Sequence, residues 1–180
     1  MSSLTLTDDL GLTVKLTGDD IQGGLGNVLQ VVNYVSVIET SQSTSTVDLI
    51  VSDISKTITP RGNNSTFLVG VRWFGEVVEA WQITFNIHMN GIRVNNIDLP
   101  YYGLAAPQTS YWGNDNSSTP NTANFKTLVT SSSVIGTPIT FDFVVSSYTA
   151  WAIWTNRCIG STGTNYERGT SEIIITEIGT

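Results

Sequence analysis

Charge, cysteine and histidine are all scarce in this chain of 180 residues. Charged residues make up 13% of it, about half the usual share, and Ser, Thr and Asn supply the remaining polarity. Cys158 is the only cysteine, which excludes an internal disulfide and a cysteine metal cluster. His88 is the only histidine, so an acyl-transfer triad would need unusual substitutes. We interpret His88 as structural, and we predict no cofactor and no metal.

Net charge and hydropathy exclude two further function classes. The formal net charge is −7, whereas nucleic-acid binding needs a basic patch. No run of 18 apolar residues occurs, as a membrane-spanning helix would require. The first residues, Met1 to Thr5, lack the basic and apolar regions of a signal peptide. We therefore expect neither nucleic-acid binding nor membrane insertion.

Short runs of Val, Ile, Thr and aromatic residues recur along the chain and predict strands. The runs are 28–38, 47–51, 67–74, 81–87, 137–145 and 170–178. Clusters rich in Gly, Asn and Ser separate them, and Asn90-Gly91 predicts a hairpin turn between 81–88 and 92–94. Residues 83, 85 and 87 are apolar and alternate with polar ones, which predicts a strand with one buried face. The sequence therefore predicts an all-β fold, an antiparallel β-sandwich or jelly-roll-like knob.

We divide the chain into residues 1–27 and a head domain, residues 28–180. The two parts differ in sequence pattern. Apolar residues alternate with Thr in 4–7 and 12–17, and a Gly-rich stretch follows at 23–26. Two such strands cannot bury their apolar faces against each other alone. They form either an extra hairpin of the sandwich or a short N-terminal β arm that attaches the protein to a partner. The predicted attachment residues are Leu4, Leu6, Leu12, Val14 and Leu16.

Several segments together resemble a known family. They are Gly24–Val32 (GLGNVLQVV), the Ser/Thr-rich stretch 40–46, residues 51–60, residues 64–71 and the ending Arg168–Ile178. In this order they resemble the head modules of tail-fibre-like and virion-surface (decoration or cement) proteins of cyanophages and marine phages. The resemblance covers residues 24–180 and departs from the pattern between 76 and 136. It implies a β-sandwich that forms a homotrimer and is displayed on the particle.

The last strand of the sandwich is predicted to contribute to both the core and a subunit contact. We expect Leu29–Val32 and Ile173–Ile178 to pair or to be neighbours, with both chain ends of the head on one side. Apolar residues occur on both faces of 172–178, which indicates that one face packs in the core and the other between subunits. The alternative is a central strand covered on both faces in a monomer. The predicted trimer-interface residues are Ile174, Ile178, Trp151 and Trp154, the two tryptophans being assigned to the core or an interface.

The length of the chain favours a place on the capsid over a place on the tail. A tail-fibre receptor binder needs an anchoring domain and a shaft, for which 27 residues leave little room. A decoration protein needs only a short arm. We therefore predict a non-enzymatic capsid decoration or cement protein on the virion surface, whose partners are copies of itself and the major capsid protein or another virion protein. The alternative is a receptor- or glycan-binding head of a phage tail fibre or baseplate.

Aromatic residues in the expected loops are the basis for the receptor- or glycan-binding alternative. Rings beside Asn and Asp suit a saccharide, because sugar C–H groups stack on rings while hydroxyls bond to amides. The candidate glycan-binding residues are Tyr101, Tyr102, Tyr111 and Trp112, facing a host surface glycan. The same rings could instead cap the core or the apex of the trimer.

Other candidate chemistry is sparse. Glycoside hydrolysis uses two flanking carboxylates, and the pairs Asp8/Asp9, Asp19/Asp20 and Glu76/Glu79 are the candidates for that role. The two aspartate pairs lie in expected turns, where Asp is favoured by turn geometry alone. The stretch 114–116 (Asn-Asp-Asn) lacks the acidic density of a calcium loop. We predict no enzymatic activity.

Overall fold

The computed structural model describes residues 3–7, 13–17, 27–43, 48–77, 83–94, 103–109, 118–147, 152–160 and 167–179. These residues form strands and turns, with no helix among them. The strands are β1 (Ser3–Thr7), β2 (Thr13–Thr17), β3 (Val28–Ser36), β4 (Thr40–Ser43), β5 (Leu49–Ile58), β6 (Thr66–Val77), β7 (Ile83–Met89), β8 (Ile92–Arg93), β9 (Gln108–Thr109), β10 (Asn121–Thr130), β11 (Ile139–Ser147), β12 (Ala152–Thr155) and β13 (Ser171–Ile178). The predicted all-β class is confirmed.

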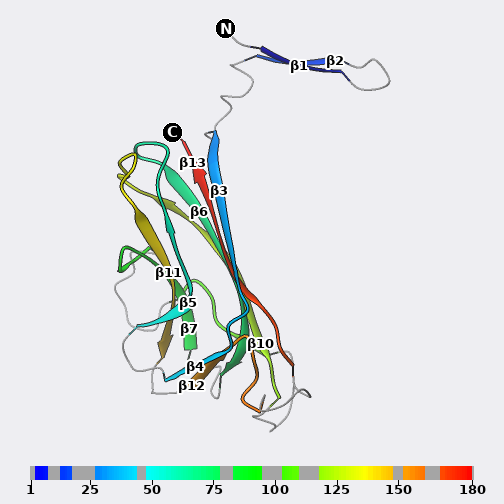
Figure 1. Ribbon diagram of the computed structural model, residues 1–180, viewed down its shortest axis with the longest axis vertical. Coiled ribbons are helices and arrows are strands. Elements are labelled where there is room, and N and C mark those ends of the chain that lie inside the picture. Colours follow the sequence, from blue (N-terminus) through cyan, green and yellow to red (C-terminus); the bar gives the residue numbers. More distant parts are fainter. Residues whose placement is uncertain are drawn as a thin grey trace.

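Two antiparallel sheets pack face to face (Figure 1). The seven-stranded sheet has the order β3-β13-β6-β10-β9, and β12 pairs with both β6 and β4. The four-stranded sheet has the order β5-β11-β7-β8. This arrangement confirms the predicted β-sandwich. β1 and β2 pair only with each other among the described strands and form a two-stranded sheet of their own.

Aromatic side chains join the two sheets at the centre of the sandwich. Phe67 and Trp73 point inward from β6, and Phe85, Phe141 and Phe143 meet them from β7 and β11, all fully buried. The ring centroids of Trp73 and Phe85 are 5.1 Å apart, and those of Phe67 and Phe141 are 5.4 Å apart. Each such ring stabilises the fold by roughly 1.5–3 kcal/mol through burial. This aromatic layer fixes the spacing of the two sheets.

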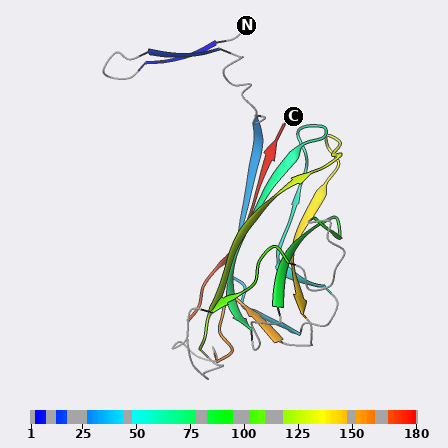
Figure 2. The same ribbon diagram turned by 180° about the vertical axis from the view of Figure 1, so that it is seen from behind.

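The two ends of the head lie together at one pole. β13 pairs antiparallel with β3 along its whole length, so that Ile178 lies opposite Val28. The amide of Gly179 donates to the carbonyl of Asn27 at 2.8 Å. In both Figure 1 and Figure 2 the start of β3 and the C-terminus lie side by side. The predicted neighbourhood of Leu29–Val32 and Ile173–Ile178 is confirmed.

The Asn90-Gly91 turn also forms as predicted. It joins β7 to β8, with φ of 51° at Asn90 and 78° at Gly91. Both residues therefore occupy the left-handed region that a two-residue hairpin turn requires. Asn and Gly adopt it at little cost, which is why this dipeptide is informative in the sequence.

Candidate interaction surfaces

The outer side of the seven-stranded sheet carries large apolar side chains that face solvent. We call it the outer apolar face and define it by Val31, Val35, Leu68, Leu128 and Ile174. Leu128 is 63% exposed and Val31 55% exposed, while Ile174 on the central strand β13 is 37% exposed. The strand register sets Val31 of β3, Thr176 of β13, Leu68 of β6 and Leu128 of β10 in one row across the sheet. Thr176 interrupts the apolar residues of this row, and Asn33 and Lys126 lie in the row of Ile174.

Few charges interrupt the outer apolar face. Arg72 on β6 and Glu172 on β13 form an ion pair at 3.3 Å, and Arg72 also donates to the carbonyl of Thr170 at 3.1 Å. Lys126 on β10 lies in the same row as Ile174. These three charged residues sum to +1 on a chain whose net charge is −7.

The outer side of the four-stranded sheet is buried over β7 and β11 but open over β5, where Ile50 is 43% exposed opposite Val144. Val144 at the centre of β11 is fully buried, and so are its neighbours Asn86 and Ser146. The alternation along β7 predicted a strand with one buried face; that prediction is wrong, because Asn86 and His88 on the second face are buried as well.

A polar cluster lies on this covered side. The Asp48 carboxylate accepts hydrogen bonds from Arg93 Nη2 at 2.8 and 2.9 Å and from Ser146 Oγ at 2.5 Å. His88 Nε2 lies 3.0 Å from Asp48 Oδ2. Burial acts to raise the pKa of Asp48, but these hydrogen bonds and charges outweigh it and lower the pKa. The Ser146 hydroxyl donates to Asp48 and not to His88, so the three side chains do not line up as nucleophile, base and orienting acid.

Three of the four predicted trimer-interface residues lie on the outer side of the seven-stranded sheet. Ile174 and Ile178 alternate with buried residues along β13 and point outward. Trp154 on β12 lies opposite Glu76 and is partly buried at the far end of the same side. Trp151 lies outside the described residues. A contact between copies at these positions stays a prediction.

The structure pairs four of the five predicted attachment residues in the β1–β2 hairpin. Its register sets Leu4 opposite Leu16 and Leu6 opposite Val14. Leu12 lies outside the described residues. Strand alternation therefore places two apolar pairs on one face of the hairpin backbone.

The remaining candidates from the sequence fall outside the described part of the chain. They are the glycan-binding candidates Tyr101, Tyr102, Tyr111 and Trp112, the acidic residues Asp8, Asp9, Asp19, Asp20 and Glu79, and the stretch 114–116. Glu76, the described member of its pair, is fully buried and accepts hydrogen bonds from the amide of Thr119 at 3.1 Å and from the Thr119 hydroxyl at 2.5 Å.

Glu177 is a buried carboxylate that the sequence did not single out. It accepts hydrogen bonds from the amides of Arg61 and Gly62, both at 2.9 Å, from Ser65 Oγ at 2.7 Å and from Gln30 Nε2 at 2.6 Å. Burial acts to raise its pKa, but these donors outweigh burial and hold the pKa below its usual value of 4.5. Glu177 thereby ties β3, β13 and the turn after β5 together at the pole where the chain ends meet.

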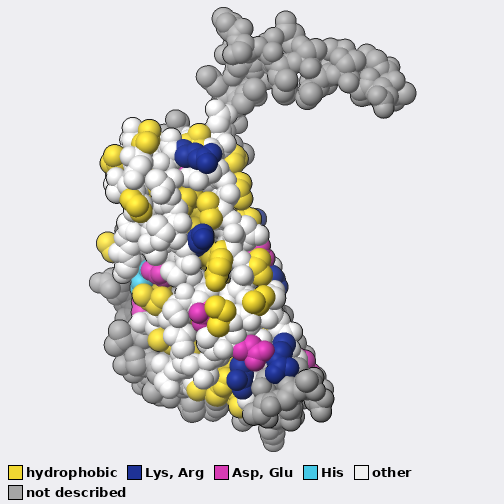
Figure 3. All heavy atoms as spheres, viewed as in Figure 1, with side chains coloured by type: hydrophobic (Ala, Val, Ile, Leu, Met, Phe, Trp, Pro, Cys, Tyr) yellow, Lys and Arg dark blue, Asp and Glu magenta, His cyan; other side chains and the backbone are white. Residues whose placement is uncertain are grey.

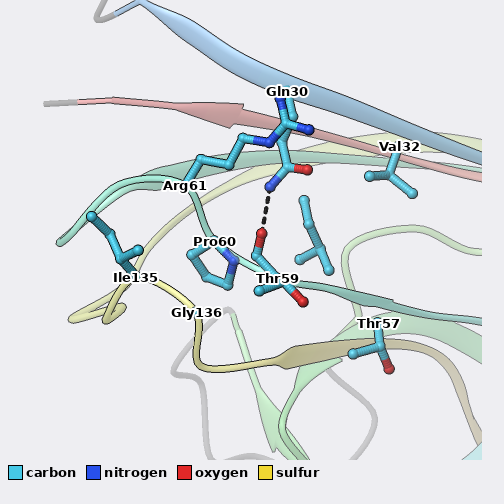
Figure 4. A pocket seen from close by; sticks show the side chains of 9 residues that line it. Gln30, Val32, Thr57, Thr59, Pro60, Arg61, Ile135 and Gly136 are labelled. Atoms are coloured by element: carbon cyan, nitrogen blue, oxygen red, sulfur yellow. Dashed lines mark hydrogen bonds between the residues drawn. The ribbon is translucent and has the colours of Figure 1, made fainter.

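A shallow groove of about 630 Å³ runs along the flank where the edge strands β3 and β5 approach each other (Figures 3 and 4). It is lined by Gln30, Val32, residues 57–61, Ile135 and Gly136. Gln30 crosses it and donates to the carbonyl of Thr59 at 2.7 Å. Farther along the same flank, Lys56 Nζ lies 5.3 Å from the centroid of the Tyr34 ring. The groove lining holds no carboxylate, imidazole or thiol, so it offers shape and hydrogen bonds but no acid–base chemistry.

No helix long and apolar enough to span a membrane occurs in the described ranges. No protein-family model matches the chain, and no curated protein matches it either. The interaction surfaces and the position of the chain ends therefore carry the functional argument.

Proposed function

We propose that this chain is a non-enzymatic structural protein of a phage virion, a homotrimeric decoration or cement protein held on the capsid exterior by residues 1–27. The observation that carries the proposal is the pairing of β3 with β13, which brings both ends of the head to one pole. The arm that precedes β3 must therefore leave the head at this pole. In this arrangement the pole with the two chain ends is the anchored end, and the opposite end of the head is displayed.

The hairpin supplies the attachment chemistry. An isolated two-stranded hairpin is at best marginally stable in water, so its apolar pairs need a cover. Leu4 with Leu16 and Leu6 with Val14 give it one apolar side. A capsid surface that accepts added strands or an apolar patch would supply that cover.

Decoration of emptied capsids in vitro tests this proposal with the full chain. Leu6→Asp with Val14→Asp introduces two charges on the apolar side of the hairpin, and we expect capsid occupancy to be lost. Thr7→Asp with Thr13→Asp is the matched control, because these residues are also directly opposed in the register but lie on the other side. Occupancy is expected to survive in this control. Equal binding by both double variants would contradict attachment through the apolar side.

A receptor- or glycan-binding head on the tail is the alternative that the loop aromatics suggest. A glycan array separates the two functions, because a decoration protein has no need of a saccharide. Binding to a defined glycan that disappears in Tyr111→Ala or Trp112→Ala would favour the tail alternative.

A further inference from the structure

An exposed turn at the edge of the four-stranded sheet contains the only Asn-Gly dipeptide of the chain. Asn90 and Gly91 join β7 to β8, and both residues are exposed. Apart from the two chain neighbours of Gly91, no described residue comes within 4 Å of the place where a Cβ at this position would stand. Asparagine is among the thermolabile residues, and a following residue without a side chain leaves its backbone nitrogen open to react with the asparagine side chain.

We infer that Asn90 is a site of spontaneous deamidation, and that Thr140 of β11 controls the rate by holding the Asn90 side chain. The inference goes beyond the proposed function and does not depend on it. In the reaction, the Gly91 nitrogen loses its proton to hydroxide and attacks Asn90 Cγ. The Cγ–Nδ2 bond breaks, and ammonia leaves with a proton from water, which gives a five-membered succinimide. Water then opens the ring at either of its two carbonyl groups and yields aspartate or isoaspartate.

The local structure distinguishes Asn90 from the other asparagines in turns. Three described asparagines have a positive φ: Asn64, Asn90 and Asn156. Asn156 is only 1% exposed. Asn64 precedes Ser65, which is fully buried and whose amide donates to Ser133 Oγ at 2.9 Å. Of the three, Asn90 is therefore the one that combines an exposed position with a following residue that has no side chain.

The fold holds the Asn90 side chain away from the reaction. The Thr140 amide donates to Asn90 Oδ1 at 2.9 Å, and the Asn90 amide donates to the Thr140 carbonyl at 2.8 Å. Closure of the succinimide ring requires Cγ to fold back onto the Gly91 nitrogen. It also requires the Asn90 backbone to leave the left-handed conformation, with φ of 51°, that the turn needs. The reaction therefore proceeds from a conformation in which the end of the hairpin has opened from β11.

The product changes the edge of the four-stranded sheet. Isoaspartate adds a carbon atom to the main chain, so that a two-residue turn no longer matches the paired strands. This mismatch weakens the register that sets His88 opposite Arg93 and Met89 opposite Ile92. Both products also add a negative charge to a chain whose net charge is −7.

Peptide mapping by mass spectrometry of the full chain tests the inference. The protein is incubated at about pH 8 in buffer and, in parallel, in guanidinium chloride. Deamidation raises the mass of a peptide by about 1 Da, and fragmentation of the peptide locates the modified residue. In guanidinium chloride we expect Asn90 to react before Asn64 and Asn86. In the folded protein we expect Asn90 to react at least about tenfold more slowly than in guanidinium chloride, because the turn must first open.

Two variants test the control by the fold. Arg93→Ala removes a hydrogen-bonded link between β8 and Asp48, and it should raise the rate in the folded protein by about threefold to tenfold. Glu39→Ala is the matched control, because its exposed pair with Arg168 lies outside the four-stranded sheet, and it should leave the rate unchanged. Circular dichroism checks that both variants fold. If Arg93→Ala does not fold, the wild-type rate in urea below the unfolding transition replaces it, and this rate should rise with urea.

Three results would overturn the inference. Modification of another asparagine ahead of Asn90 in guanidinium chloride would show that the site is wrong. Equal rates in the folded and the unfolded protein would show that Thr140 does not hold the side chain back. A folded-state rate that neither Arg93→Ala nor urea changes would show that opening of the hairpin does not limit the reaction. None of these results bears on capsid attachment, which is measured separately.

Discussion

Single buried groups fix the two ends of the sandwich. Glu177 collects donors from three segments at the pole where the chain ends meet. Glu76 accepts the amides of Thr119 and Ile159 near the other end of β6. A buried carboxylate is unfavourable unless its lone pairs are satisfied, and these two are. Each therefore ties loops to a neighbouring strand.

Replacing Glu177 tests the first clamp. Glu177→Gln keeps the shape but removes the charge, and we expect it to lower the free energy of unfolding at pH 7 by about 1–3 kcal/mol. Because the folded-state pKa of Glu177 lies below 4.5, the carboxylate contributes its stability above that pH and loses it as the pH falls through the folded-state value. Urea unfolding of the wild type and of Glu177→Gln, from pH 7 down to about pH 2, measures the difference between their free energies of unfolding. This difference should become smaller as the pH falls. A difference in free energy of unfolding that stays constant with pH would show that the charge of Glu177 does not contribute to stability.

Cys158 gives a second prediction at this scale. The thiol is fully buried, and burial together with the charges of Glu76 and Glu167 raises its pKa to about 12. Because the thiolate is the reactive form, the folded protein should react with an aromatic disulfide reagent at pH 8 at least about a hundredfold more slowly than the protein in guanidinium chloride. Stopped-flow absorbance measures both rates. Comparable rates in the two states would place the thiol in solvent.

Among the elements, the four-stranded sheet depends on a polar cluster that its covered side encloses. Asp48 precedes β5, Arg93 ends β8, and Ser146 belongs to β11, so their hydrogen bonds join three segments. β8 has only two residues, and among the described strands it pairs with β7. The Arg93–Asp48 contact adds a link from β8 to the segment that begins β5.

A double-mutant cycle tests this dependence. Asp48→Ala and Arg93→Ala should each lower the free energy of unfolding by about 1–3 kcal/mol, because each removes a charged hydrogen-bond partner from a part-buried site. The double variant should cost less than the sum, with a coupling of about 0.5–3 kcal/mol. Glu39→Ala is the control: its pair with Arg168 is exposed and should contribute less than about 1 kcal/mol. Additive losses at Asp48 and Arg93 would contradict the cluster.

Elements with local signals could be predicted from the sequence. The Asn90-Gly91 turn and the β-branched run at 170–178 each carry their own pattern, and both form as expected. Glu177 could not be recognised as a clamp, because its amide donors at Arg61 and Gly62 lie more than 100 residues away. The burial of the second face of β7 could not be predicted from the sequence for a related reason. A polar residue such as Asn86 predicts exposure in an alternating strand, and only the tertiary fold buries it.

The whole molecule has a pole at which the two ends of the head meet. The first proposal uses the pole, since β3 and β13 bring the head's two ends together.

A density map of the phage particle that carries this chain tests the account most directly. We predict clusters of three copies on the capsid exterior, with the β3–β13 pole toward the capsid. Single copies on the capsid, or copies found on the tail with that pole directed away from the particle, would contradict it.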